Sequence, residues 1–340
     1  MTIAVLLSAC EVVPWAAKVD GATITQSQLN TYVSDVVHNS KYLCELSLSS
    51  GGKLNPKGPS GGSYTSTFVD TELSELIIAK LVSNEVKLRR LTINNTDISL
   101  ARTDLVASLG AQTPQCPYSG SEVFSSFPIS YQISQIKYLA QEEELAANLG
   151  GISIGHKAIA AYYSSHTQQF TDSCIKIIEV GSKAQADGTR ATIEGGVSFS
   201  TMASKVSLDQ TTAAQGGVVG CVAPGPPPFS PLQQAVMALP VGQISQPIAF
   251  QSNWIIFKVY KRYLEPEGTV TTQIRQDLIG GQAAAFNTLI KQLAFKSHIV
   301  VNSMYGEWKG LNAVSGPITS PPPPPARFML PTDVTTTPFP

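Results

Sequence analysis

Hydrophobic positions repeat with a helical period over several long stretches of the chain. From Asp70, a residue type that caps helices, Leu and Ile recur every three or four positions as far as Leu88, with Glu and Lys on the opposite side. Similar patterns predict further helices over residues 96–109, 122–148, 153–170 and 271–296. The pair Gly280-Gly281 interrupts the last of these. These stretches predict helices that pack against a core.

Shorter stretches predict β-strands. Residues 17–25 predict a strand, a turn at Asp20-Gly21 and a second strand, because Asp-Gly supplies the positive φ angles of a two-residue hairpin turn. The run CIKIIEV at 174–180 predicts another strand, and residues 254–259 predict the last strand of the same region. Together with the helical stretches, these strands favour an α+β fold.

Two segments lack the apolar positions of a packed element. Residues 49–66 are mostly Gly, Ser and Pro, which predicts a flexible loop inserted among the helices. Residues 313–340 contain five consecutive prolines and predict a disordered or polyproline II tail. We favour a cell-envelope spacer for this tail over a ligand of an SH3-type domain.

Composition and charge narrow the class of protein. A length of 340 residues suits two domains, and 43 % hydrophobic residues can supply a sizeable core. The formal net charge of −1 provides no basic surface for nucleic acid, so partners are expected to meet apolar and hydrogen-bonding surface. The four histidines have no metal-ligand spacing, and the motifs of hydrolases and nucleotide enzymes are absent from the sequence. We therefore assign no metal and no cofactor.

The amino terminus combines a short apolar run with Leu7-Ser8-Ala9-Cys10. This arrangement resembles a bacterial lipoprotein signal, which implies a diacylglycerol on Cys10, a tether as far as residue 16 and attachment to the outer face of the cell membrane. The run has no Lys or Arg before it and is shorter than the ~7–15 apolar residues of a usual signal. The alternative is a buried strand that ends in a core cysteine.

Residues 171–263 carry a consistent series of local signals. Phe199, Met202 and Ala203 have helical spacing, the glycines at 216–220 permit a tight turn into a strand, and Ser230 can cap a helix that starts with Pro231. In this order the segment resembles parvulin-type (PpiC-like) peptidyl-prolyl isomerases. The resemblance implies a four-stranded antiparallel sheet with flanking helices.

The same resemblance implies a binding site for proline. Its apolar walls correspond to Val219, Phe229, Leu232, Met237 and Trp254. Rotation about an X–Pro bond has a barrier near ~20 kcal/mol and needs no covalent chemistry, so an apolar, desolvating pocket can lower it.

The polar part of the family's site differs here. Asp209 stands at the acidic position and is the candidate catalytic residue, although an Asp there can equally cap a helix or loop. The two histidine positions of the family fall near Ile177 and at Trp254, and no histidine lies between residues 172 and 263. Isomerase activity is therefore an open question at the level of sequence.

The rest of the chain resembles SurA- and PrsA-like extracytoplasmic chaperones. The similar features are the opening hairpin and helix, the helix with Tyr162 and Tyr163 before the isomerase-like segment, and the V-x-x-x-Y-G-x-W segment at 301–308. The resemblance implies a discontinuous helical chaperone domain, made of residues 17–170 and a returning helix in 264–312, with the parvulin-like domain inserted.

The four cysteines other than Cys10 form an even set without CxxC spacing, which fits disulfides in an oxidising compartment better than zinc. Three pairings are open. We favour Cys44–Cys116 and Cys174–Cys221, because each pair then stays inside one expected domain. The alternative is four reduced cysteines in the core.

These observations predict an extracytoplasmic folding factor that binds unfolded or proline-containing polypeptides and holds to the membrane through a lipid anchor. One alternative is a non-catalytic module in which the parvulin-like domain only docks peptides. A third interpretation, a passive envelope protein, predicts no affinity for unfolded chains.

Overall fold

The computed structural model describes residues 14–52, 56–58, 63–110, 112–225, 227–312 and 316–319. The expected signal and the lipidation site Cys10 lie outside these residues. The chain divides into two compact units, the first made of residues 1–152 and 281–340 and the second of residues 153–280. Among the described residues, every helix is too short or too polar to cross a membrane.

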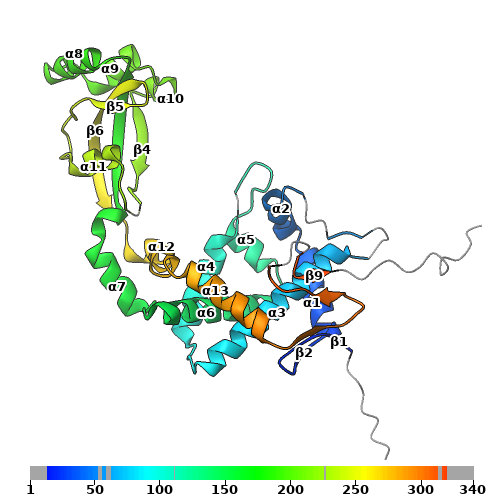
Figure 1. Cartoon of the computed structure of the whole chain (residues 1–340). Helices are drawn as coiled ribbons and strands as arrows, with labels where there is room; N and C mark the ends of the chain where they lie inside the picture. The colour runs from blue at the N-terminus through cyan, green and yellow to red at the C-terminus, as the bar shows by residue number, and fades with distance from the viewer. Residues whose placement is uncertain are drawn as a thin grey trace, which may run out of the picture. The chain divides into compact units, whose positions relative to one another are not determined.

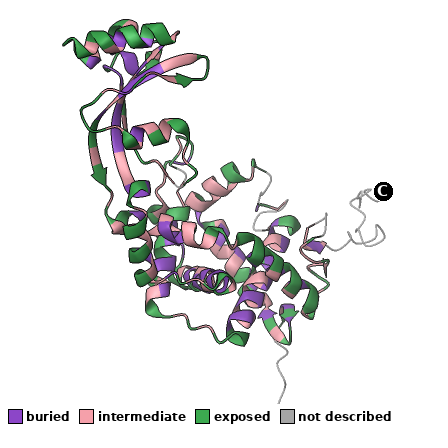
Figure 2. Ribbon diagram, turned by 60° about the vertical axis from the view of Figure 1, so that its left-hand side comes forward, coloured by how far each residue is buried: buried purple, intermediate pink, exposed green. Residues whose placement is uncertain are grey.

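Unit 1 is mainly helical (Figure 1). Its helices are α1 (Gln26–His38), α2 (Ser40–Ser49), α3 (Ser66–Leu88), α4 (Asn95–Ser108), α5 (Gly120–Ser125), α6 (Ile129–Gly150) and α13 (Ala283–Lys296). Helix α3 is central, because it packs against α1, α6 and α13. Its core stripe includes Leu73, Ile77 and Leu81, which are at most 2 % exposed, and Figure 2 shows buried positions on helices throughout this unit.

A small sheet joins the two ends of the chain within unit 1. Strands β1 (Trp15–Val19) and β2 (Ala22–Thr25) form the predicted hairpin, and β7 (Ile299–Val301) pairs antiparallel with β1. The strand order is β2-β1-β7. Because β7 comes from the carboxyl-terminal part of the chain, unit 1 is built from two separate segments of the sequence.

Three sequence predictions about elements in this region were incomplete. The predicted helix over 122–148 is two helices, α5 and α6, because Pro128 cannot continue a helix and instead precedes the first residue of α6. Part of the expected disordered tail is structured, since β9 (Ile318–Thr319) pairs with β8 (Glu307–Trp308) and buries Ile318. Helix α3 begins at Ser66, four residues before Asp70.

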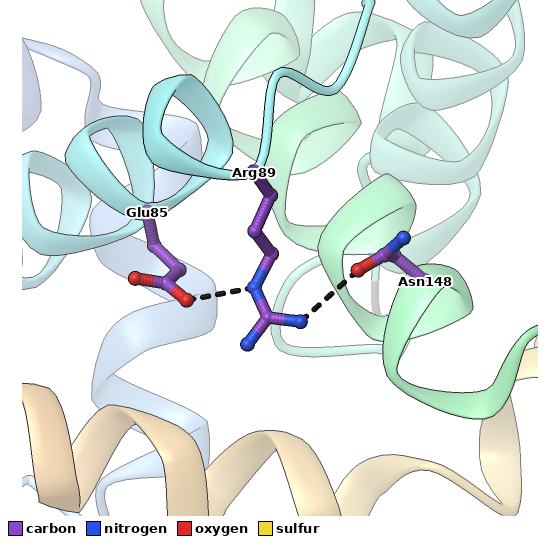
Figure 3. Close-up of polar contacts among 3 residues, drawn as sticks. All are labelled: Glu85, Arg89 and Asn148. Carbon is purple, nitrogen blue, oxygen red and sulfur yellow. Dashed lines mark hydrogen bonds and ion pairs between the residues drawn. The ribbon is translucent and has the colours of Figure 1, made fainter.

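Arg89 links the carboxyl-terminal ends of α3 and α6 (Figure 3). Its Nε lies 2.7 Å from Oε1 of Glu85, and its Nη1 donates to Oδ1 of Asn148 at 3.1 Å. The Glu85 side chain is only 9 % exposed, so the guanidinium compensates a largely buried carboxylate.

Unit 2 contains a four-stranded antiparallel sheet of order β4-β3-β6-β5. Its strands are β3 (Thr171–Val180), β4 (Val218–Val222), β5 (Ile248–Phe250) and β6 (Asn253–Leu264). Its helices are α7 (His156–Ser165), η1 (Thr167–Phe170), α8 (Lys183–Glu194), α9 (Phe199–Val206), α10 (Gln210–Ala213), α11 (Pro231–Ala238) and α12 (Glu267–Gly280). The predicted α+β class with a four-stranded antiparallel sheet is confirmed.

Helices α7 and α12 pack together at one end of unit 2. Arg275 of α12 is 1 % exposed and donates Nη1 to the carbonyl of Ile154 at 2.6 Å, and the Tyr163 hydroxyl donates to the carbonyl of Glu265 at 2.5 Å. The division between the units follows Gly280, so α12 lies in unit 2 and α13 in unit 1. The resemblance implied that all of residues 264–312 belong to the helical domain, and the structure differs from this expectation for α12.

Candidate functional site

The two faces of the sheet in unit 2 are covered by different helices. On one face, Ile175, Phe257 and Val259 pack with Val236 of α11. On the other face, Ile178 and Ile256 pack with residues of α8 and α9. Strand β3 pairs with β6 in the register Ile177↔Phe257 and Ile178↔Ile256, and alternate residues point to opposite faces. The sheet therefore has an α11 face and an α8/α9 face.

Helix α11 forms as its sequence predicts. Ser230 accepts from the backbone N–H of Gln233 at 3.3 Å, the Gln233 side chain accepts from the Ser230 N–H at 2.7 Å, and Pro231 occupies the first turn. The Gln233 side chain also donates to the carbonyl of Pro224 at 2.7 Å. One side chain thus holds both the helix start and the loop before it.

Arg262 fixes the other end of α11. Its Nε donates to Oγ of Ser173 at 3.1 Å, and its Nη2 donates to the carbonyls of Val236 and Leu239, the second at 2.8 Å. These carbonyls belong to the last turn of the helix, which has no helical partner for them. Sequence reasoning missed this residue. In the sequence, Arg262 is only a cation near the end of a β-rich segment. Its role becomes visible when the last carbonyls of α11, which need hydrogen-bond donors, are considered with it.

The turn into β4 explains the glycines of the parvulin-like pattern. Gly216 and Gly217 have φ of +68° and +82°, and the carbonyl of Gly217 accepts from the N–H of Ile177 at 2.8 Å. A Cβ on Gly217 would lie 2.5 Å from the Ile177 carbonyl oxygen. Only glycine permits this approach, which brings β4 against β3.

Four of the predicted proline-pocket residues lie on two elements and the loop before α11: Leu232 and Met237 on α11, Val219 on β4, and Phe229 just before α11. Leu232 packs against the cluster of Ile175 and Phe257, which leaves it half-buried. Phe229 and Met237 are half-buried, and Val219 on the edge strand β4 is 42 % exposed. Phe229, Leu232 and Met237, on α11 or just before it, therefore present apolar side chains that solvent reaches only in part.

Trp254 does not share this surface. It packs with the cluster of Ile178 and Ile256 on the α8/α9 face and pairs with Val180, whereas Ile177 belongs to the α11 face. The expectation that Trp254 lines the same site as Leu232 therefore needs correction, because adjacent strand residues point to opposite faces. The residue next to it, Ile255, has the orientation of Ile177, and both are aliphatic.

Asp209 acts as a helix cap. Its Oδ1 accepts from the Thr211 N–H at 3.0 Å and its Oδ2 from the Thr212 hydroxyl at 2.6 Å, at the start of α10. The hydrogen bond from the Thr212 side chain is the main reason that the pKa of Asp209 lies below its usual value. With both oxygens engaged in this way, Asp209 is a stable anion and a poor proton acceptor.

The Ser-x-Asp element around Asp209 is attached to β3. Ser207 Oγ accepts from the N–H groups of Glu179 and Asp209 at 3.1 and 3.3 Å, and the Leu208 N–H donates to the carbonyl of Glu179 at 2.8 Å. These hydrogen bonds give Ser207 and Asp209 a structural role in holding this element against β3.

The structure contains both favoured disulfides. Cys174 and Cys221 occupy paired positions of β3 and β4, and Cys44 of α2 joins Cys116 in the loop before α5. Each bridge lies within one unit. Among the residues that the structure describes, no three His, Cys, Asp or Glu side chains are grouped so as to hold a metal ion.

Residues 178–261 match the family model "Rotamase: PPIC-type PPIASE domain". The matched residues start in β3 and end in β6, so they include α8 to α11 and the glycine turn. Unit 2 therefore contains a PPIC-type, parvulin-like domain, as its sequence resemblance predicted.

Curated relatives extend the similarity beyond this domain. Foldase protein PrsA of Caldanaerobacter subterraneus subsp. tengcongensis is 23 % identical over 211 residues, which are 60 % of this chain and 62 % of the relative. A parvulin-like PPIase of Rickettsia prowazekii is 26 % identical over 147 residues, or 42 % of this chain and 52 % of the relative. The periplasmic chaperone PpiD of Haemophilus ducreyi is 22 % identical over 186 residues, or 52 % of this chain and 29 % of the relative. The chain thus spans less than two thirds of the length of each.

Proposed function

We propose that this protein is an extracytoplasmic folding factor that binds unfolded polypeptides and docks their proline-containing segments on the α11 face of its parvulin-like domain. The observation that carries this proposal is the PPIC-type match over residues 178–261, within which the capped helix α11 contributes Leu232 and Val236 to an apolar cluster on one face of the sheet. The foldase and chaperone names of the relatives support the same function.

Chemistry at this site is limited to holding and desolvating the X–Pro bond. The family's two histidine positions fall near Ile177 and at Trp254, which face opposite sides of the sheet and carry no histidine, and Asp209 is engaged as a cap. An apolar wall can still favour the twisted amide by excluding water from the imide. We therefore assign isomerase activity, where present, to the apolar wall and not to acid–base groups.

A non-catalytic peptide-docking domain is the second candidate. The observation that favours it is the capping role of Asp209, which leaves the α11 face without the polar group of the family pattern. In that case the protein binds unfolded chains but leaves the rate of proline isomerisation unchanged.

A proline-limited refolding assay separates the two candidates. We expect the full chain to accelerate the slow refolding phase of a substrate with a non-native prolyl bond, and Leu232→Ser to abolish the acceleration because it places a hydroxyl in the apolar wall. Asp209→Ala is the matched control and should retain the acceleration if circular dichroism shows that it is folded. Identical refolding rates with and without the protein would select the docking domain, and loss of activity in Asp209→Ala would restore that residue as catalytic.

The location of the protein is proposed from its disulfides and relatives. Two disulfides suit an oxidising compartment outside the cytoplasm, and one relative is called a periplasmic chaperone. We further propose the lipid anchor at Cys10 and the outer face of the cell membrane as its place. Fractionation of cells that express the wild type and Cys10→Ala tests this, since release of only the variant from the membrane fraction is expected.

A further inference from the structure

Unit 1 contains a cavity of about 580 Å³. Its walls come from β2, α1, α3 and α6, with Thr23, Thr31, Leu76 and Ser134 as representatives of the four elements. All four elements belong to unit 1, so the cavity is a feature of this unit by itself.

One wall of the cavity is the outer edge of a sheet. Strand β2 pairs with β1 on one side only and forms the edge of the order β2-β1-β7 (Figure 1). Val19 and Ala22 flank the Asp20-Gly21 turn, and residues that flank a two-residue hairpin turn form a hydrogen-bonded pair. The pairing alternates along the strand, so the N–H and C=O groups of Thr23 point away from β1.

The floor of the cavity is aromatic. The rings of Tyr32 and Tyr131 lie with their centroids 5.1 Å apart, and the Tyr32 hydroxyl accepts from Nε2 of Gln135 at 3.1 Å. Burial raises the pKa of both phenols, so they remain neutral hydrogen-bonding groups.

The charge of the lining selects a particular kind of occupant. Most lining side chains are hydroxyl, amide or apolar, and the two charged ones, Asp35 on α1 and Lys80 on α3, have opposite signs. Neither forms an ion pair with any residue in the described part of the chain. A neutral chain with peptide groups complements this lining, whereas a nucleotide or a polyanion would meet Asp35 without enough cations.

We infer that this cavity binds an extended segment of an unfolded polypeptide, which adds as a strand to the outer edge of β2 at Thr23 and places an apolar side chain on the Tyr32–Tyr131 pair. Strand addition supplies main-chain hydrogen bonds that do not depend on the client's sequence, which suits a protein with many clients. The edge is only four residues long, so affinity is modest and release is easy. The inference rests on the proposed function and assigns its client site within unit 1.

The direct test compares two synthetic peptides on the full-length protein. The probe is a fluorescein-labelled peptide of alternating Val and Ser, and its partner has the same sequence with N-methyl groups on alternate amides. Fluorescence anisotropy should show binding of the first and about tenfold weaker binding of the second, because the methyl groups remove the donors that pair with the edge. Equal affinity for the two peptides would overturn strand addition.

Substitutions inside and outside the cavity test whether the peptide binds there. Ser134→Arg fills the cavity from an exposed helical position and should weaken peptide binding about tenfold, whereas Ser99→Arg, at an exposed serine of α4 outside the cavity, should change it less than about twofold. Thr23→Pro removes the outward donor from the edge and should also weaken binding. Thermal unfolding by circular dichroism checks that each variant is folded, and Ser134→Arg remains decisive if Thr23→Pro is not.

The outcomes distinguish this site from the proposed function as a whole. If Ser134→Arg and Ser99→Arg bind the peptide as the wild type does while the wild type suppresses aggregation of an unfolded protein, the inference fails and the proposed function stands. If the wild type neither binds the peptide nor suppresses aggregation, both fail. Tighter peptide binding after deletion of residues 320–340 would identify the tail as the occupant, and a dimer that Ser134→Arg converts to monomer would identify a second copy. Either result overturns the assignment to clients.

Discussion

Glu72 carries a carboxyl group inside unit 1 that faces aromatic and acidic neighbours. It is 9 % exposed, and burial, followed by the charge of Glu75, raises its pKa to about 8. Its charge also raises the pKa values of Tyr32 on α1, Tyr42 on α2 and Tyr131 on α6. Near neutral pH a large fraction of Glu72 is therefore protonated, which avoids much of the cost of a buried charge.

This raised pKa predicts a pH-dependent stability for unit 1. A carboxyl whose folded pKa exceeds its unfolded value of 4.5 contributes fully below that value, and the contribution is lost as pH rises towards about 8. We expect the free energy of unfolding to fall over this window by up to roughly 4 kcal/mol. Glu72→Gln, which stays neutral, should flatten the fall.

Urea unfolding between pH 5 and pH 8 measures this effect. Glu307→Gln is the control, because Glu307 is an exposed carboxylate of the same unit, with its side chain 73 % exposed. A slope in Glu72→Gln equal to that of the wild type would show that another group titrates.

At the scale of elements, α11 depends on contacts at both of its ends. The capping box fixes its start, and Arg262 holds its last carbonyls to β3 through Ser173. The helix contributes Leu232 and Val236 to the α11 face, so its position controls the apolar wall of the candidate site.

Arg262→Lys should loosen this helix although the charge is kept. A lysine has a single ammonium and cannot reach Ser173, Val236 and Leu239 together, which we expect to cost about 1–3 kcal/mol of stability in unit 2. Hydrogen exchange followed by mass spectrometry should show faster exchange over residues 231–239. Lys261→Ala, at an exposed neighbouring cation, should leave that exchange unchanged, and unchanged exchange in Arg262→Lys would contradict the anchoring role.

At the scale of the whole molecule, each unit has its own core and its own disulfide. Cys44–Cys116 closes 72 residues within unit 1, and Cys174–Cys221 closes 47 residues within unit 2. Loop-closure entropy makes each bridge worth about 4 kcal/mol in a simple chain model.

Removal of one bridge should therefore weaken one unit. We expect Cys174→Ser with Cys221→Ser to lower the unfolding temperature of unit 2 and to leave protection in the core of unit 1 unchanged, and the Cys44/Cys116 double variant to do the reverse. Hydrogen exchange over α3 and β6 reports on the two units separately. Equal loss of protection in both units after either change would argue against this independence.

The sequence alone determined the features that depend on neighbouring residues. The Asp20-Gly21 hairpin, the Ser230 cap with Pro231, the break at Gly280-Gly281 and the glycine turn before β4 follow from local backbone preferences, and all are present. The four-stranded antiparallel sheet and the PPIC-type domain were implied by the resemblance of this segment to parvulin-type isomerases.

Tertiary structure decided what depends on pairing between distant segments. A one-residue difference in position moves a strand residue to the other face, so only the register of β3 with β6 separates Trp254 from the α11 face. The attachment of the Ser-x-Asp element to β3, through the Glu179 N–H that donates to Ser207 Oγ, likewise depends on a segment far away in the sequence. The cavity beside β2 is formed by helices from separate parts of the sequence that pack next to the edge of this strand. No local sequence pattern predicts that arrangement.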